Sequence, residues 1–153
     1  MTFHPLVQPE PITSMLSVPT VDSEAFWRAC DLCEFRLPQC CACKRYSYFP
    51  RRHCPHCGGR ELTFESAPTT GTVHSFAHIR FSPFGDFWTG DLPYTVVRVD
   101  LDSSVRFLSR LVGARREEVC IGDRAEIQFA PVKQSERRIP VFALAATNRT
   151  RGA

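Results

Sequence analysis

The sequence predicts a mainly β protein: a short N-terminal helix, then a small cysteine-bounded ribbon, then a five-stranded barrel. Three observations favour this fold class. Two Cys-x2-Cys pairs lie within residues 40–57, short segments rich in Val, Phe, Thr and Tyr follow from about residue 61, and turn residues separate those segments. With 153 residues, the chain fits one compact domain or a small domain with an appendage. A chain of this length buries roughly 68–70% of its unfolded surface, so it does not need disulfides to be stable.

Composition narrows the class further. The formal charge of +3 and the pI near 8.5 are too mild to imply nucleic-acid binding. No long apolar run occurs, and residues 1–10 lack the basic start and apolar core of a secretory signal. We therefore expect a cytoplasmic protein without a membrane span. In that compartment paired cysteines are more often metal ligands or redox groups than bridges.

The N-terminal third divides into an extended segment and a helix. Four prolines fix φ in the first segment, residues 1–21, and predict an extended tail or strap: Pro5, Pro9, Pro11 and Pro19. Apolar residues then recur with helical period at Phe26, Cys30, Cys33 and Leu37. This spacing predicts a helix at about 22–33, within a unit spanning 22–36, and Pro38 prevents its continuation. The ribbon follows at 37–60, the barrel at 61–147 and a short tail at 148–153.

The strongest signal is the cysteine quartet. Its members are Cys40, Cys43, Cys54 and Cys57. Two such pairs at this spacing are typical of a structural zinc site, in which four thiolates close the coordination shell and leave no position for a reacting water. Iron–sulfur ligation and four buried or redox cysteines are the alternatives. Gly58 and Gly59 supply the backbone freedom that a metal knuckle requires.

Other potential ligands lie near the quartet. His53 and His56 are expected to be exposed, although His replaces thiolate in mixed zinc sites. For Cys30 and Cys33 we favour core packing over a second metal or redox site, because free cysteine behaves as a small apolar residue. Cys41 is a spare thiol beside a ligand and a competitor for metal.

The barrel unit, residues 61–147, is predicted from six strand-like segments. They are 61–67, 71–82, 93–101, 104–112, 124–132 and 140–146. In the second of them, alternation predicts that Val73, Ser75, Ala77, Ile79 and Phe81 face the core. Residues 114–121 have helical spacing and predict one short helix that carries Cys120 on its apolar face. A five-stranded Greek-key barrel with one such helix is an OB-fold.

Positive charge is concentrated on the ribbon. Between residues 35 and 60 there is no acidic residue, and the basic residues are Arg36, Lys44, Arg45, Arg51, Arg52 and Arg60. Such a patch attracts phosphate. RNA or DNA, the phosphates of coenzyme A, an acidic protein surface and a merely solvated face are all consistent with it. Single-stranded nucleic acid would also need stacking side chains on the open barrel face, for which the candidates are His74, Phe76, His78 and Arg80.

An aromatic loop interrupts the strands. Residues 82–92 contain Phe84, Phe87 and Trp88 between two glycines. Large aromatic side chains on a loop are either plugs for the end of a barrel or anchors for a partner protein, and we favour the partner. No nucleophile–base arrangement, phosphate-binding glycine loop or catalytic carboxylate pair stands out.

These motifs in this order resemble a known family. They are Phe26-Trp27, the quartet, the insert YFPRRHCPHCGG, and then GTVHSF, LPYTVVRVDL, FLSRLVG and IGDRAEIQF. Over about residues 22–146 the chain is similar to the zinc-ribbon plus OB-fold acyl-CoA-associated proteins, long labelled a domain of unknown function. It departs from their pattern at Glu34-Phe35, where a glycine is common, and in the extra thiols Cys30, Cys33 and Cys41.

The resemblance implies a function. Members of that family generally lack catalytic residues and assemble with a thiolase-like enzyme, an aldolase related to it, or a MaoC-like enoyl-CoA hydratase. It therefore implies a zinc-binding, non-catalytic subunit of a hetero-oligomeric thiolase, acyltransferase or aldolase complex in lipid or steroid metabolism, which helps to admit acyl-CoA. On this interpretation Lys44, Arg45, Arg51 and Arg52, with the aromatic loop, contact coenzyme A or the partner. The alternatives are a single-stranded nucleic-acid binder, a partner of a MaoC-like hydratase and a free-standing enzyme.

Overall fold

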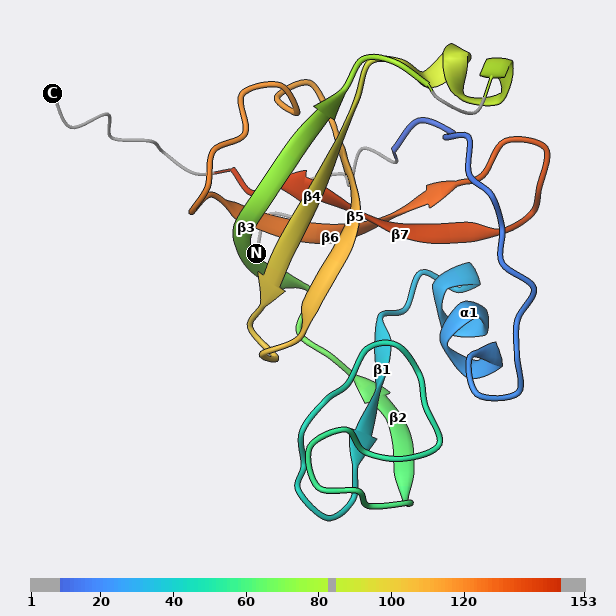
Figure 1. Ribbon diagram of the computed structural model, residues 1–153, viewed down its shortest axis with the longest axis vertical. Helices are drawn as coiled ribbons and strands as arrows, with labels where there is room; N and C mark the ends of the chain where they lie inside the picture. Colours follow the sequence, from blue (N-terminus) through green and yellow to red (C-terminus); the bar gives the residue numbers. More distant parts are fainter. Residues whose placement is uncertain (1–8, 83–84, 147–153) are drawn as a thin grey trace, which may run out of the picture.

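The computed structural model describes residues 9–82 and 85–146 and has the predicted architecture, with the ribbon and helix beneath a barrel (Figure 1). One α-helix, one 3-10 helix and seven strands make up the described chain. In order they are α1 (Glu24–Asp31), β1 (Arg36–Cys40), β2 (Leu62–Ser66), β3 (Thr70–Ile79), η1 (Gly85–Asp91), β4 (Tyr94–Leu101), β5 (Arg106–Val112), β6 (Arg124–Pro131) and β7 (Arg138–Leu144). Each strand from β2 to β7 coincides with a predicted segment to within two or three residues at either end.

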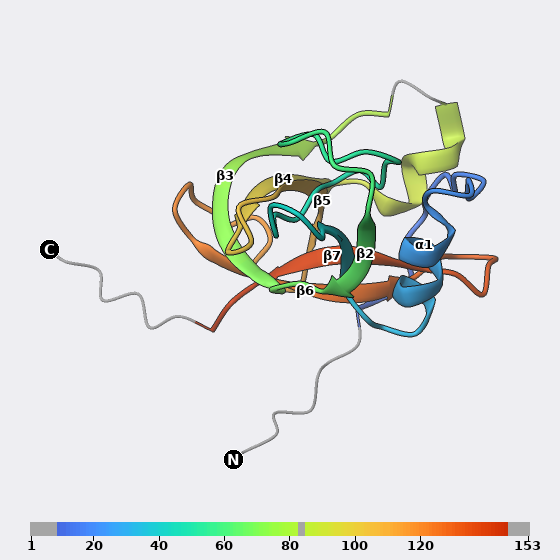
Figure 2. The ribbon, with the colours of Figure 1, turned by 90° about the horizontal axis from the view of Figure 1, so that it is seen from below.

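The barrel closes in the strand order β3-β4-β5-β7-β6. All its pairs are antiparallel except β5 with β7, and the pairing of Thr70–Thr72 with β6 closes the ring (Figure 2). Strand β2, which the sequence assigned to the same unit as the barrel, pairs with β1 instead and forms the two-stranded sheet of the ribbon. Among the described residues, no helix is long and apolar enough to cross a membrane.

The prediction of a helix at residues 114–121 is wrong. This segment forms successive turns, closed by single bonds such as that from the Glu118 N–H to the Arg115 carbonyl. Glycines in the left-handed region, Gly113 (φ +94°) and Gly122 (φ +92°), bound it. A stretch of eight residues gains too few bonds to offset helix nucleation unless it packs well, and only Val119 is buried here. Cys120, expected in the core, is exposed.

A β-bulge in β3 overturns the predicted facing of that strand. The register with β4 shifts between Val73 and Ser75, so that Phe76 pairs with Val97 and His78 with Thr95. Directly paired residues share a face, and Val97 and Thr95 are buried. The extra residue therefore inverts the alternation beyond Val73. In consequence Ala77 is exposed, and so is Phe81 beyond the strand, where 77% of its surface is accessible.

One aromatic cluster joins the helix, the ribbon and the barrel. Phe26 of α1 contacts Phe35 edge to face, and Phe35 contacts Phe107 of β5 at 5.7 Å between ring centroids. Tyr48 from the ribbon loop lies 4.3 Å from the Phe107 ring. Phe107 in turn meets Phe142 of β7 at 6.0 Å. The three parts therefore share a single hydrophobic core.

Gly71 occupies a position in β3 that no other residue fits. A Cβ atom there would lie 2.5 Å from the Asp100 carbonyl oxygen and 2.8 Å from the Leu101 Cα. Gly71→Ala is expected to lower the free energy of unfolding by about 1–3 kcal/mol, because the obstruction is backbone of the neighbouring strand. Urea denaturation measures this. Gly90→Ala is the matched control, since its Cβ would meet nothing within 4 Å, and an equal loss in both variants would contradict the steric argument.

A buried ion cluster fastens the N-terminal segment to the barrel. The Asp91 carboxylate, 6% exposed, accepts bonds from the Thr13 N–H and hydroxyl, from Arg110 at 2.7 Å and from Lys133. Ile12 also forms a bridge with Val132. Burial alone would raise the pKa of Asp91, but Lys133, Thr13 and Arg110 hold it well below its usual range. Residues 9–20, which we call the strap, are thus tied down at Ile12 and Thr13.

Candidate metal centre and partner surface

The four cysteines sit on two knuckles with the same backbone geometry. In the first, the Lys44 N–H donates to the Cys40 carbonyl and the Cys40 N–H donates to the Arg45 carbonyl. In the second, Gly58 and Gly59 take the places of Lys44 and Arg45 relative to Cys54, at 2.9 and 2.8 Å. Each knuckle turns back through a left-handed residue, Lys44 (φ +59°) or Gly58 (φ +74°).

The sulfur positions fit one metal ion. Cys40 and Cys57 Sγ lie 3.6 Å apart, as do Cys43 and Cys54 Sγ, and all four atoms lie within 4.8 Å of one another. Tetrahedral thiolates at about 2.3 Å from an ion would be about 3.8 Å apart. A Cβ on Gly59 would meet Cys40 Sγ at 3.1 Å, so the chain passes close beneath the sulfurs. The quartet can hold a metal ion.

Backbone N–H groups favour the thiolate form of two quartet members, Cys40 and Cys54. The Gly59 N–H acts in the same direction on Cys57, but the neighbouring thiols and burial raise the pKa of Cys57 to about 11. The Cys43 N–H, with that of Ala42 and the neighbouring thiols, lowers the pKa of Cys40 to about 7 despite burial. The His56 N–H points at Cys54 Sγ at 3.4 Å, and although burial raises the pKa of that thiol, such N–H groups bring it below 9.0. Thiolate is the form that binds metals, so the surroundings of Cys40 and Cys54 suit these two thiols to that role.

Cys30 and Cys33 do not belong to the quartet. Cys30 is fully buried in the aromatic core, and burial, with the nearby Asp31 charge, raises its pKa to about 12. The core prediction is thus confirmed for Cys30, whereas Cys33 is exposed, just beyond the end of α1, with φ +59°. Within residues 9–82 and 85–146, the quartet is the only group of three or more ligand-type side chains close enough to share an ion. His53 and His56 are exposed, as predicted.

The basic ribbon residues are all exposed, and one of the four proposed contact residues is already paired. Arg52 forms an ion pair with Asp22 at 3.2 Å, just before α1. In the described part of the chain, Lys44, Arg45 and Arg51 have no acidic partner within 4 Å. The predicted patch is therefore present on the surface, and these three residues are the unpaired members of the four proposed contact residues.

The aromatic loop falls only partly within the described residues. Phe84 lies outside them, and of Trp88 only the backbone, in η1, is described. Phe87 is 55% exposed. The choice between a barrel plug and a partner anchor stays a prediction here.

The structure does not form the predicted nucleic-acid stacking face. The bulge turns Phe76 and His78 toward the face of Val97 and Thr95, and His78 Nδ1 lies 2.9 Å from the Thr95 hydroxyl. His74 lies on the other face, 3.4 Å from Asp100 and beside Arg106. Stacking successive bases requires several rings on one surface. Phe76 and His78 remain neighbours, with ring centroids 5.3 Å apart, but His74 does not share their face, which weakens the support for that alternative.

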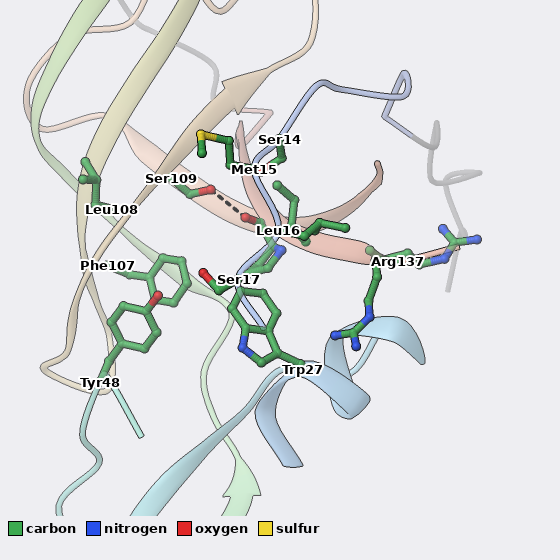
Figure 3. Close-up of a pocket in the computed structure, with 13 residues that line it drawn as sticks. Ser14, Met15, Leu16, Ser17, Trp27, Tyr48, Phe107, Leu108, Ser109 and Arg137 are labelled. Carbon is green, nitrogen blue, oxygen red and sulfur yellow. Dashed lines mark hydrogen bonds between the residues drawn. The ribbon is translucent and has the colours of Figure 1, made fainter. Parts of the chain in front are cut away.

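Sequence reasoning missed a groove between the strap, α1 and the barrel (Figure 3). Its walls come from Tyr48, Trp27, Phe107 and the strap residues Met15 and Leu16. The apolar residues of the strap could have indicated from sequence that this segment takes part in a binding surface. Sequence could not show that the strap meets the ribbon loop and β5, because that meeting depends on contacts between segments far apart in the chain.

Known proteins with the same architecture match this chain. The family model described as "ChsH2, C-terminal OB-fold domain" matches residues 65–130. Among solved structures, "Ltp2-ChsH2(DUF35) aldolase" matches with a TM-score of 0.74 and 27% identity, covering 85% of this chain and 99% of that one. A DUF35 protein of unknown function from Sulfolobus solfataricus matches with a TM-score of 0.53 and 14% identity, covering 81% and 85%, and shows the fold alone.

Another relative is similar to this chain over only part of the relative's own length. The "Probable enoyl-CoA hydratase alpha subunit" of Thermomonospora curvata is 30% identical over 119 residues, which are 77% of this chain. The chain spans only 36% of that protein. The cysteine ribbon, the closed barrel, the ChsH2 family match and the ChsH2 structure agree: residues 65–130 match the ChsH2 C-terminal OB-fold domain, and ribbon and barrel together have the fold of the DUF35 proteins.

Proposed function

We propose that this chain is a zinc-holding, non-catalytic partner subunit of a thiolase-like enzyme that acts on acyl-CoA. One observation carries the proposal: ribbon and barrel together match the ChsH2 chain of an Ltp2-ChsH2 aldolase over 99% of its length. The quartet would hold Zn2+ through Cys40, Cys43, Cys54 and Cys57. Four thiolates fill a tetrahedral shell, so the ion would supply structural rigidity to the ribbon.

The basic patch supports a role near an anionic surface. Lys44 and Arg45 belong to the first knuckle and Arg51 precedes the second, so all three lie exposed on the loops that carry the quartet. The phosphates of a coenzyme A ester, or acidic residues of the partner, would complement them. A ribbon made rigid by the bound ion would present these charges in fixed positions, which reduces the conformational entropy lost when the contact forms.

Replacing the unpaired arginines tests this role. In the assembled enzyme, Arg45→Ala with Arg51→Ala is expected to raise the KM for the CoA ester, or to weaken assembly, by about three- to tenfold, with a smaller salt dependence. Arg52→Ala is the matched control, because Asp22 already neutralises Arg52. Unchanged kinetics and assembly in the double variant would reduce the patch to a solvated face.

Coexpression tests the proposal as a whole. The chain, produced with a thiolase-fold protein from the same organism, is expected to co-elute as a hetero-oligomer whose mass is measured by light scattering. Carbon–carbon bond cleavage or formation on a CoA ester should require both subunits. If the two proteins elute separately and the larger one is fully active alone, the proposal fails.

A hydratase partnership is the second candidate. It is favoured by the similarity to the hydratase alpha subunit, of which this chain would correspond to about a third. The two candidates separate in the same experiment when a MaoC-like protein replaces the thiolase-fold protein. Hydration of an enoyl-CoA, monitored as the loss of absorbance of the conjugated thioester, would then identify the hydratase complex.

A further inference from the structure

A groove of about 120 Å³ opens where the strap, α1, the ribbon loop and the barrel meet (Figure 3). Phe107, 2% exposed, belongs to its inner wall, and the Tyr48 ring lies against Phe107. The Tyr48 ring also stacks on Phe49, at 4.2 Å between centroids, and Phe49 is 62% exposed. Trp27 of α1 adds a third aromatic ring to the wall. The exposed end of the shared aromatic core therefore lies at this groove.

The size of the groove limits what can occupy it. Pockets for cofactors and drug-sized ligands usually measure about 300–1,000 Å³. A volume of about 120 Å³ instead suits one side chain of the size of leucine or phenylalanine. The groove is thus built for a protein anchor rather than for a CoA ester.

Exposed apolar side chains surround the groove. Met15 is 72% exposed, Leu108 59% and Leu16 41%. All three line the groove, and Val18, 87% exposed, follows them on the strap. An apolar rim around a pocket that accepts one side chain has the layout of a protein interface, in which a central anchor is enclosed by contacts that exclude water.

The charged groups of the groove are hydrogen-bond donors, and the hydroxyls of Ser14, Ser17 and Ser109 also line it. Its charged lining consists of Arg137 and Arg138, with no carboxylate, and Arg137 has only a 3.7 Å pairing with Asp31. In the portion of the chain that the structure describes, neither the Trp27 indole N–H nor the Tyr48 hydroxyl takes part in a hydrogen bond. Such groups usually find a partner when partly buried. The complementary occupant offers an apolar side chain next to carboxylate or carbonyl oxygens.

We infer that this groove is the anchor site for the thiolase-like partner subunit, which inserts one apolar side chain flanked by an acidic residue. The inference rests on the proposed function and names the surface through which it acts. It also moves the expected anchor from the aromatic loop at Phe84, Phe87 and Trp88 to Trp27 and its neighbours.

Fluorine NMR distinguishes the two surfaces. The chain has two tryptophans, so labelling it alone with 5-fluorotryptophan gives two resonances, which Trp88→Phe assigns. On addition of the unlabelled thiolase-fold protein, the Trp27 resonance is expected to shift and broaden, because the partner replaces water around the indole. Light scattering on the same sample reports independently whether a complex forms.

A negative charge introduced at the rim of the groove provides the matched variant. Leu108→Glu places a carboxylate where the partner is inferred to carry one, and Arg98, paired with Leu108 across β4 and β5, makes it tolerable in the isolated chain. It is expected to weaken the complex at least about tenfold. Ile121→Glu, at a 70% exposed residue outside the groove, is expected to leave the affinity unchanged.

Each remaining outcome overturns the inference. A complex that forms normally with Leu108→Glu and shifts only the Trp88 resonance would place the anchor on the aromatic loop and leave the proposed function intact. A Trp27 shift that appears with rising concentration of the chain alone would make a second copy the occupant. If no complex forms at all, the proposed function and this inference fail together.

Discussion

Replacing Cys54 by Ser is expected to remove the bound metal and with it most of the soluble protein. Cys54 is 3% exposed, and its sulfur lies 3.6 Å from that of Cys43. A serine hydroxyl does not ionise near neutral pH and cannot replace a thiolate. Structural zinc contributes on the order of 10–16 kcal/mol of apparent binding energy to folding. Loss of one ligand therefore threatens a net stability of about 5–15 kcal/mol. Elemental analysis and soluble yield measure the two effects.

Two other thiols serve as controls for this prediction. Cys120 is exposed and outside the quartet, so Cys120→Ser should keep one zinc per chain and full stability. Cys41 is adjacent to the ligand Cys40, and Cys41→Ser tests whether this spare thiol competes for metal. A Cys54→Ser protein that retains a full equivalent of zinc and its fold would refute the site. Iron instead of zinc in the wild-type protein would keep the site and change its metal.

The metal quartet could be predicted from sequence because its geometry is local. Each Cys-x2-Cys pair makes its own turn, closed by bonds four and five residues apart, so spacing alone determines where the sulfurs point. The strands were also predictable, since runs of β-branched and aromatic residues between turn residues are typical of an all-β fold. Their order in the barrel was expected from the resemblance to a known family.

The errors arose where a distant contact overrides a local pattern. Alternation in β3 was inverted by one unpaired residue, and nothing in the letters around Val73 and Ser75 marks a bulge. Helical spacing at residues 114–121 did not produce a helix, because the segment buries only Val119. Both outcomes depend on pairing and packing against neighbouring strands. The local spacing of apolar residues in a single sequence does not contain that information.

The groove and the Asp91 cluster were missed for the same reason. Thr13 and Asp91 are separated by 78 positions, and Lys133 lies another 42 further along. The prolines of the strap predicted an extended course but not where it attaches. Asp91 had been counted only as part of the aromatic loop, although it is one of the least exposed carboxylates in the described chain.

Asp91→Asn is expected to lower the free energy of unfolding by about 3–5 kcal/mol. The substitution keeps the shape of the side chain but removes the negative charge that Arg110, 11% exposed, and Lys133 contact. Removing one partner of a buried ion pair has effects of this size, because the remaining charge is costly to hide from water. The strap should also detach at Thr13, so hydrogen exchange at the Thr13 amide is expected to accelerate in the variant.

The pH dependence follows from the direction of the Asp91 shift. Its folded pKa is lowered, so the carboxylate contributes stability that is fully present above the unfolded pKa of about 3.9. That stability is lost as pH falls toward the folded value. The difference in unfolding free energy between the wild type and Asp91→Asn should therefore stay constant from pH 8 to pH 5 and shrink only below about pH 4. A difference that already fades at pH 6 would contradict the shift.

An exposed carboxylate provides the comparison that isolates burial. Asp102 pairs with Arg124 at 2.6 Å much as Asp91 pairs with Arg110, but both side chains of the Asp102–Arg124 pair are 42% exposed. Water and salt screen such a pair, so Asp102→Asn should lose much less stability than Asp91→Asn, and what it loses should diminish in 0.5 M salt. The Asp91→Asn loss should resist the same salt because Arg110 and Asp91 are shielded from solvent. Equal losses and equal salt sensitivity in the two variants would mean that the Asp91 cluster is held no more firmly than an ordinary surface ion pair.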